Sequence, residues 1–185
     1  MKQTILNKAE QQLMLGGYDK LNFATIANDL NTTRANIHYH FKNKESLAVE
    51  VTRQYAERHS EEFKALCLSF NGDFIGLFTA IDDAFWFDDN LSVMCNILAA
   101  DPEIPKMILT LTQKLYQDIE CLIIDAIQHG VDSKQIRDDV DVVREAARVH
   151  VLMMGIISAA QHSPDLGQAK QQLSGLLVDW ANSLS

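Results

Sequence analysis

The side chains best suited to chemistry in this chain lie between Arg34 and Lys44. Tyr39 and His40 follow Asn36 by three and four residues, so on a helix they lie on the same face as Asn36. An Asn amide can pair with an adenine edge, and an Arg can reach a guanine or a phosphate. Tyr and His are suitable donors to phosphates or base edges. This combination predicts a surface that contacts double-stranded DNA.

Lys44 occupies an unusual position for a cation. Asn43 is placed to cap a helix that starts at Lys44, and a cation in the first turn opposes the helix dipole by about 0.3–1 kcal/mol. That cost is understandable if Lys44 and the free N–H groups hold a phosphate together. The alternative, ordinary solvated surface, would suit a single Arg or Lys, but five polar groups on one surface favour DNA contact.

A helix-turn-helix is the element that would present these side chains. Apolar pairs four residues apart predict three helical segments around a small core: Ile26 and Leu30, Ile37 and Phe41, Leu47 and Val51. Asn31 tolerates a left-handed backbone, and a Thr after it can cap the second helix. We expect Thr33 to face DNA, and Thr25 to cap the first helix of the motif and add a phosphate contact. The second helix would enter the major groove.

This stretch resembles the DNA-binding domain of the TetR family of regulators. The resemblance is carried by Thr25-Ile26-Ala27, by residues 32–41, by Lys44-Glu45-Ser46-Leu47, and by Gly17-Tyr18 and Phe23 upstream. Asn31 replaces the usual turn glycine, and His38 stands where a Tyr is common. The match covers roughly residues 1–60. It implies an all-helical, dimeric, cytoplasmic regulator, usually a repressor that a small molecule releases from DNA.

The composition agrees with a reduced, cytoplasmic, helix-rich protein. The 185 residues include 47% hydrophobic ones, eight Gly and three Pro. No apolar run approaches the roughly 18–20 residues of a membrane span, and the amino terminus does not read as a signal peptide. Three widely spaced cysteines, Cys67, Cys95 and Cys121, suggest neither a disulfide framework nor a metal site. Catalytic, cofactor and metal motifs are absent from the sequence, so we expect no enzyme.

The charge is divided unevenly along the chain. Residues 1–59 carry eight Lys and Arg against six Asp and Glu, a net charge of +2, whereas residues 60–185 carry −11. The net charge of the whole chain, −9, therefore conceals the basic character of the amino-terminal segment. A basic end and an acidic body predict that one end faces DNA.

The sequence predicts an all-α chain of about nine helices in two domains. Residues 1–47 would form the three-helix DNA-binding domain, and residues 48–185 an effector-binding and dimerisation bundle. Outside the motif, helices are expected over about 4–15, 44–69, 74–87, 91–100, 102–129, 142–162 and 164–184. Gly16-Gly17 would end the first of these. The helix over 44–69 would link the domains rigidly, because no Pro or Gly interrupts it.

The second domain contains large, adaptable apolar side chains that could line a ligand pocket. The candidates are Phe78, Phe85, Trp86, Met94, Cys95, Tyr116, His150, Met153 and Met154. They would suit a hydrophobic or aromatic molecule. Aromatic and methionine side chains at helical spacing also make ordinary core, and residue by residue that alternative is the stronger. Cys95 could be an electrophile-sensing thiol, but a buried structural cysteine is the simpler interpretation.

The two carboxy-terminal helices carry stripes of small and apolar residues. Such stripes could form a four-helix interface with a second copy or could only close the domain's own core. The residues alone leave these two alternatives even, and the family resemblance favours the dimer. The expected interface residues are Leu152, Gly155, Ile156, Ala159, Leu173, Leu176 and Trp180. Asp82-Asp83 is expected at a solvated helix end.

These features together predict a homodimeric, DNA-binding regulator that responds to an unknown small-molecule effector. Its DNA partner would be a palindromic operator. The alternative is a helical ligand- or protein-binding module of the same fold that regulates no gene.

Overall fold

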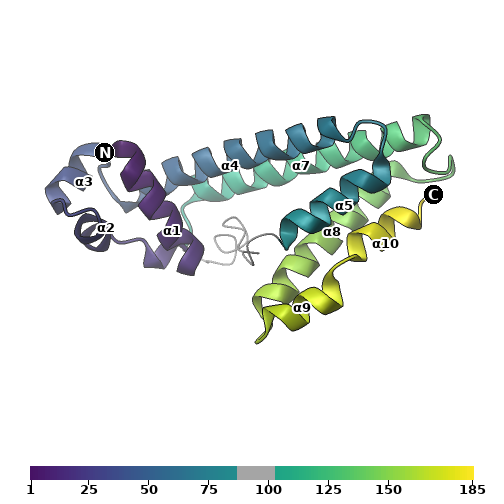
Figure 1. Cartoon of the computed structure of the whole chain (residues 1–185). Helices are drawn as coiled ribbons and strands as arrows, with labels where there is room; N and C mark the ends of the chain where they lie inside the picture. Colours follow the sequence, from purple (N-terminus) through teal and green to yellow (C-terminus); the bar gives the residue numbers. More distant parts are fainter. Residues whose placement is uncertain (87–102) are drawn as a thin grey trace. The chain divides into compact units, whose positions relative to one another are not determined.

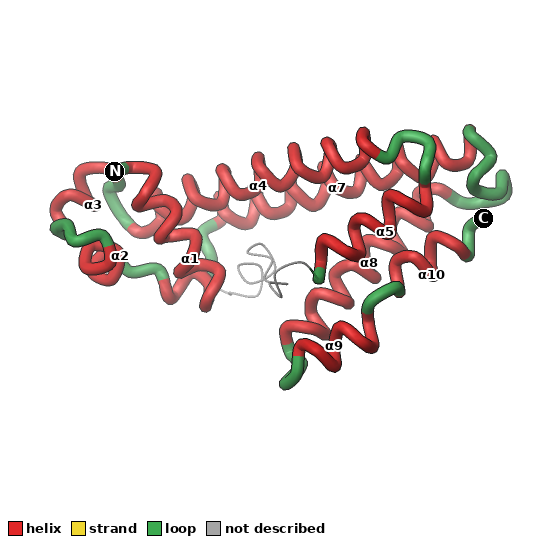
Figure 2. The backbone as a smooth tube through the Cα atoms, in the orientation of Figure 1, coloured by secondary structure: helices red, strands yellow, loops and turns green. Residues whose placement is uncertain are grey.

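The computed structural model describes residues 1–86 and 103–185, which form helices and connecting loops without a strand (Figures 1 and 2). The expected all-α class is confirmed. Backbone contacts divide the chain into two compact units. The first contains residues 1–59 and 103–116, and the second contains residues 60–86 and 117–185. The division falls within two helices, α4 (Lys44–Ser69) and α7 (Lys106–Asp132). The predicted helix over 91–100 and its preceding turn lie outside the described residues.

In the first unit, α1 (Lys2–Lys20) packs by an apolar stripe. Ile5, Ala9 and Leu13 are completely buried, as their spacing predicted. The helix is broken at the expected place, because Gly17 has a φ of 72° and only glycine adopts that conformation readily. One further helical turn reaches Lys20, so the glycines kink the helix and do not end it.

The first helix of the motif begins three residues earlier than expected. Helix α2 (Phe23–Asp29) is capped by Asn22, whose side chain accepts hydrogen bonds from the N–H groups of Ala24 and Thr25. The prediction that Thr25 caps this helix was wrong, because Phe23 is itself helical and is buried. Helix α3 (Arg34–His40) follows after a short turn.

The second unit contains α5 (Phe74–Phe85), α8 (Val142–Gln161), α9 (Leu166–Leu173) and α10 (Leu176–Asn182). Helix α10 packs against both α5 and α8 (Figure 1). Their shared core includes the Trp180 ring, whose centroid lies 4.8 Å from that of Phe78. On α8, Val149, Met153, Ile156 and Ala160 are buried. Leu152 is half-buried and Ala159 is exposed, so these two expected interface residues lie outside the buried stripe of α8.

The single helix expected over 164–184 is two helices. The break is at Gly175, which has a φ of 87° and precedes α10. Glycine is the residue for which this left-handed conformation carries no steric cost. Spacing alone does not distinguish a glycine inside a helix from one that breaks it, so the sequence predicts one continuous helix here.

Helix α7 also differs from the expected segment at both ends. It begins at Lys106 and not near Pro102, since Pro105 disfavours a helical conformation at Ile104. It passes through Gly130 and ends at Asp132. A Cβ on Gly130 would lie 2.6 Å from Cδ1 of Ile136, so this glycine permits a close approach and does not cap the helix. The spacing of the apolar residues predicts an inward stripe that continues from Leu115 through Leu122 and Ala126. In the structure the buried residues beyond Leu115 are instead Ile123 and Ile127, one position later.

The break at Gly175 gives a stability prediction. Gly175→Ala should lower the free energy of unfolding by about 1–2 kcal/mol, because a Cβ is unfavourable in the left-handed region. Gly175→Asn should cost less, since Asn adopts this region more readily. Urea unfolding of the three proteins measures the difference. Equal stability of the Ala variant and the unchanged protein would contradict the assigned break.

Candidate functional site

Helix α3 is oriented by its cap and its buried side. The turn before it contains Asn31 with a φ of 49°, the left-handed conformation that was expected. The Thr33 hydroxyl oxygen accepts from the Asn36 N–H at 3.2 Å and caps the helix, also as expected. Ile37 is completely buried and Phe41 is 5% exposed. The opposite side of this short helix is therefore directed away from the core.

The exposed side of α3 carries the predicted DNA-facing groups. Tyr39 is 84% exposed, which is unusual for an aromatic side chain in a folded domain. Its ring meets the His40 ring edge-on, with centroids 5.2 Å apart. Arg34 is exposed on the first turn of the same helix. These three side chains present hydrogen-bond donors and an aromatic ring at the surface, where a DNA partner could reach them without any rearrangement of the core.

Asn36 is less free than its neighbours. It is half-buried, and its Nδ2 donates to the Thr32 hydroxyl oxygen at 2.9 Å. This bond fixes the orientation of the amide before any partner arrives. A preorganised amide loses less conformational entropy on binding. The role of Thr32 was not visible in the sequence, because it depends on the exact path of the turn.

Lys44 is held toward the α1–α2 connection. Asn43 and Ser46 cap the start of α4 reciprocally, with Ser46 N–H donating to Asn43 Oδ1 at 2.8 Å and Asn43 N–H donating to Ser46 Oγ at 3.3 Å. Lys44 is the first residue of α4, as expected. Its ammonium lies 4.3 Å from the centroid of the Tyr18 ring and donates to the Asp19 carbonyl at 3.4 Å. Cation–π contact therefore offsets part of the unfavourable helix-dipole interaction.

Two other residues of the motif complete the description. Thr25 is exposed within α2. His38 contacts the Phe23 ring, with centroids 4.9 Å apart, and its Nδ1 lies 3.3 Å from the Lys42 carbonyl. All of the predicted DNA-facing residues thus belong to the first unit and are exposed or half-buried.

The residues predicted to line a ligand pocket are dispersed. Phe78, Trp86 and Met153 are buried, and Phe85, His150 and Met154 are half-buried in the second unit. Phe78 packs against Phe74 and Trp180, so its ring belongs to the domain core. Tyr116 belongs to the first unit. Met94 and Cys95 lie outside the described residues.

A cavity of about 370 Å³ lies in the second unit at the end of α4, the start of α5 and the end of α7. Its floor includes the buried Phe74 and Leu77, and its more polar wall includes Lys64, Asp125 and His129. None of the predicted ligand residues lines it. The sequence signal was present in α7, where the one-residue shift of the buried stripe leaves Leu122 and Ala126 facing this cavity.

Cys67 lies on the wall of this cavity. Burial raises the pKa of its thiol to about 11, with the Asp125 carboxylate adding to the rise and a backbone hydrogen bond opposing it. A thiol with such a pKa is almost entirely protonated near neutral pH. Because the thiolate is the nucleophile, Cys67 is poorly reactive there.

The predicted dimer residues fall into two groups. Ile156 is 2% exposed within the core, and Trp180 Nε1 donates to Glu145 Oε2 at 3.1 Å. These two side chains therefore pack or form hydrogen bonds within their own subunit. Gly155 and Ala159 are exposed, and Leu152, Leu173 and Leu176 are half-buried. Val151, which was not predicted, is 72% exposed on α8.

Residues 1–86 and 103–185 contain neither a candidate membrane span nor a candidate metal site. No helix there is both long and apolar enough to span a membrane. No cluster of three or more His, Cys, Asp or Glu side chains in these ranges is arranged to bind a metal ion.

Comparison with known proteins gives one family and many similar folds. Residues 5–51 match the family model described as "Bacterial regulatory proteins, tetR family". No curated protein matches the chain. A TetR-family transcriptional regulator from Cytophaga hutchinsonii is 15% identical, with a TM-score of 0.85 over 100% of this chain and 94% of that chain.

Two similar structures contain ligands. The Stenotrophomonas maltophilia repressor SmeT, solved as its complex with triclosan, is 18% identical over 98% of this chain and 90% of that one, with a TM-score of 0.76. FadR from Bacillus subtilis, in complex with stearoyl-CoA, is 14% identical over 100% of this chain and 95% of that one, with a TM-score of 0.68. At these identities the likeness establishes the fold.

The environment of Cys67 gives a prediction about thiol reactivity. In a pulse of iodoacetamide at pH 8, Cys67 should be alkylated much more slowly than the exposed Cys121. Its rate should rise about tenfold per pH unit toward pH 11, since the thiolate fraction rises by that factor below the pKa. Peptide mass spectrometry measures both sites in one sample. Equal rates for the two cysteines at pH 8 would contradict the buried, protonated thiol.

Proposed function

Because the chain belongs to the TetR family of bacterial regulatory proteins, we propose that it is a homodimeric repressor that a small ligand releases from its operator. The fold and the helix-turn-helix already support DNA-binding transcriptional regulation. The observation that carries the proposal is the exposed side of α3, where Tyr39 is 84% exposed beside Arg34 and His40.

We assign DNA contact to three segments of the first unit. Thr33, Arg34 and Asn36 open α3 and would read base edges or adjacent phosphates. Tyr39, His40 and Lys44 would bind mainly phosphates, with an additional contact from Thr25. Residues 1–47 constitute the proposed DNA-binding domain, and α4 leads from it into the proposed effector domain of residues 48–185.

The proposed dimer uses α8, α9 and α10. Gly155, Ala159 and Val151 leave an exposed small and apolar strip on α8, which suits close packing against a second copy. Leu173 and Leu176 would extend it on α9 and α10. A two-fold dimer places two recognition helices about 34–36 Å apart, one turn of DNA, and thereby explains a palindromic operator.

Ligand release would act through that spacing. A hydrophobic or aromatic molecule held among the helices of the second domain would tilt α4 and separate the two recognition helices. A hundredfold preference for the separated form shifts the equilibrium by about 2.7 kcal/mol, which is enough to release an operator. SmeT and FadR, which share the fold, were solved with triclosan and stearoyl-CoA, of which the first is an aromatic molecule and the second carries a long apolar acyl chain.

Selection from random-sequence DNA at near-physiological salt tests the proposal directly. We expect an enriched palindrome whose half-sites are about one turn apart. A folded, dimeric protein that enriches no sequence would contradict the repressor and favour the alternative, a helical binding module without a gene-regulatory role.

The Lys44 contact predicts a change in salt dependence. Lys44→Ala should reduce the slope of log affinity against log salt by about 0.9 per lost phosphate contact, hence about 1.8 per dimer. Lys170→Ala removes the same charge from α9 in the second unit and should leave the slope unchanged. Fluorescence anisotropy on the selected operator measures both slopes. An equal decrease of the slope in the two variants would show that Lys44 acts only through the net charge of the protein and makes no phosphate contact of its own.

Asn36 predicts a change in specificity. Asn36→Ala should weaken binding to the preferred operator by about 1–3 kcal/mol and relax the sequence requirement at one base pair in each half-site. Thr32→Val removes the acceptor that orients the amide and should produce a smaller change at the same base pair. Repeated selection with each variant measures this. An unaltered sequence preference would exclude Asn36 as a base-reading residue.

A further inference from the structure

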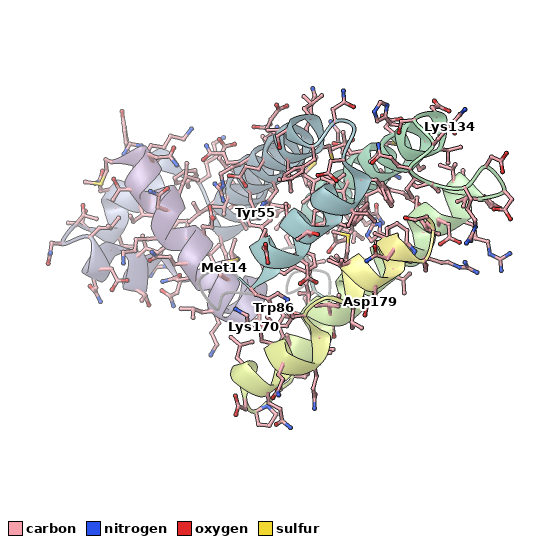
Figure 3. The ribbon with its side chains drawn as sticks, turned by 45° about the vertical axis from the view of Figure 1, so that its right-hand side comes forward. Met14, Tyr55, Trp86, Lys134, Lys170 and Asp179 are labelled. Atoms are coloured by element: carbon pink, nitrogen blue, oxygen red, sulfur yellow. The ribbon has the colours of Figure 1, made fainter. Side chains whose placement is uncertain are left out.

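Two polar atoms on one side of α5 are buried without a hydrogen-bond partner in the described structure. They are Oδ1 of Asp82, whose residue is 4% exposed, and Nε1 of Trp86, whose residue is 5% exposed. Residues four apart along a helix are neighbours on one face, so the side chains of Asp82 and Trp86 leave the backbone on the same side of α5. Trp86 stands at the carboxyl end of this helix (Figure 3).

The position of Asp82 corrects an expectation. The sequence placed Asp82-Asp83 at a solvated helix end, and Asp83 is indeed exposed, but Asp82 is in the core. The other oxygen of Asp82, Oδ2, accepts from the Gly175 N–H at 3.0 Å and from the Ser174 hydroxyl at 3.2 Å. These two bonds to the α9–α10 turn fix the carboxylate plane. The orientation of the unpaired oxygen is therefore set by tertiary structure.

Two buried polar atoms without hydrogen-bond partners on one helix are unusual in a protein interior. Burying a carboxylate oxygen or an indole N–H without a partner is unfavourable, and most buried polar atoms are hydrogen-bonded. Side-chain atoms that remain unpaired therefore require an explanation, such as a site for a bound group. Here one atom is an acceptor and the other a donor, and both side chains are more than nine-tenths buried.

We propose that Asp82 and Trp86 form the polar recognition pair of the effector site, and that the effector carries a hydroxyl group on an apolar body. This inference rests on the proposed ligand-responsive function. A hydroxyl donates one hydrogen bond and accepts another. It donates to Asp82 Oδ1 and accepts from Trp86 Nε1–H, which satisfies both atoms at once.

Other ligand groups satisfy the pair less well. An ammonium group has only donors and leaves the Trp86 N–H unpaired. A carboxylate has only acceptors and is repelled by Asp82. A methyl ether accepts from Trp86 but offers no donor to Asp82. Of these four groups, only the hydroxyl of an alcohol or phenol pairs with both atoms.

The same contact would connect the effector to the α9–α10 turn. Asp82 bonds to Gly175 and Ser174 through one oxygen and would bind the hydroxyl through the other. A hydroxyl donating to Oδ1 draws electron density from the carboxylate and changes how strongly Oδ2 holds this turn. The helices that follow and precede the turn are those of the proposed dimer interface.

The test compares phenols with their methyl ethers on the full-length protein without DNA. The probes are phenol, 1-naphthol and triclosan, each paired with its own methyl ether, and titration calorimetry measures the affinities. We expect at least one phenol of this set to bind about tenfold or more tightly than its ether, since a hydrogen bond to a charged acceptor is worth that factor or more.

Substitutions then assign the preference to named atoms. In Asp82→Asn the remaining carbonyl oxygen stays with the Gly175 N–H, so the amide presents a donor to the ligand and the phenol-to-ether ratio should fall to about one. Trp86→Phe keeps the ring but removes the donor, and should weaken phenol binding about fivefold. Asp83→Asn removes the same charge at the exposed neighbour and should leave the ratio unchanged. Circular dichroism and thermal unfolding verify that each variant is folded.

Two results would overturn the inference. One is the absence of binding by every phenol of the set, and the other is a phenol-to-ether ratio that Asp82→Asn leaves unchanged together with a phenol affinity that Trp86→Phe leaves unchanged. The outcome is independent of the DNA selection. Asp82-dependent phenol binding without an enriched operator would support the ligand site and contradict the repressor. An enriched operator without phenol binding would support the repressor and contradict the ligand site.

Discussion

The presentation of α3 depends on the burial of two side chains. A helix of seven residues is far shorter than the roughly 12–15 residues at which isolated helices become even marginal in water. Ile37 and Phe41 are buried in the core of the first unit, and the Thr33 hydroxyl oxygen accepts from the Asn36 N–H at the start of the helix. The segment is helical because the domain holds it. The direction of Arg34, Tyr39 and His40 is consequently a property of the domain and not of the helix alone.

The first unit surrounds this helix with contacts between distant segments. Asn22 N–H donates to Gln12 Oε1 at 2.9 Å, which fixes the connection of α1 to α2. Arg58 of α4 donates to Glu10 of α1 at 2.7 Å. A partly exposed ion pair contributes at most about 1 kcal/mol, so its main effect is to fix geometry. Lys44 reaches back to Tyr18 and Asp19 in the same way.

In the second unit, hydrogen bonds between distant segments join the helices around an apolar core. Gln135 accepts from the Phe74 N–H at 2.8 Å, Glu145 accepts from Trp180, and Asp82 accepts from Gly175. Each bond joins segments at least 35 residues apart. Such bonds add directional specificity to the core, which apolar contacts alone do not supply. They also explain why two acidic residues, Asp82 and Glu145, are buried in an acidic domain.

The sequence by itself determined the helical class, the register of the helix-turn-helix and the residues that its exposed side carries. These follow from local rules, namely apolar spacing, side-chain caps and left-handed turn residues, so Thr33, Asn31 and Asn43 could be assigned correctly. Tertiary structure decided the features that depend on distant partners. Gly175 breaks a helix where the α9–α10 turn meets Asp82, the stripe of α7 shifts by one residue, and Asp82 is buried although its local sequence suggests a solvated end. Periodicity reports which face of one helix is apolar, but it contains no information about which segment will cover that face.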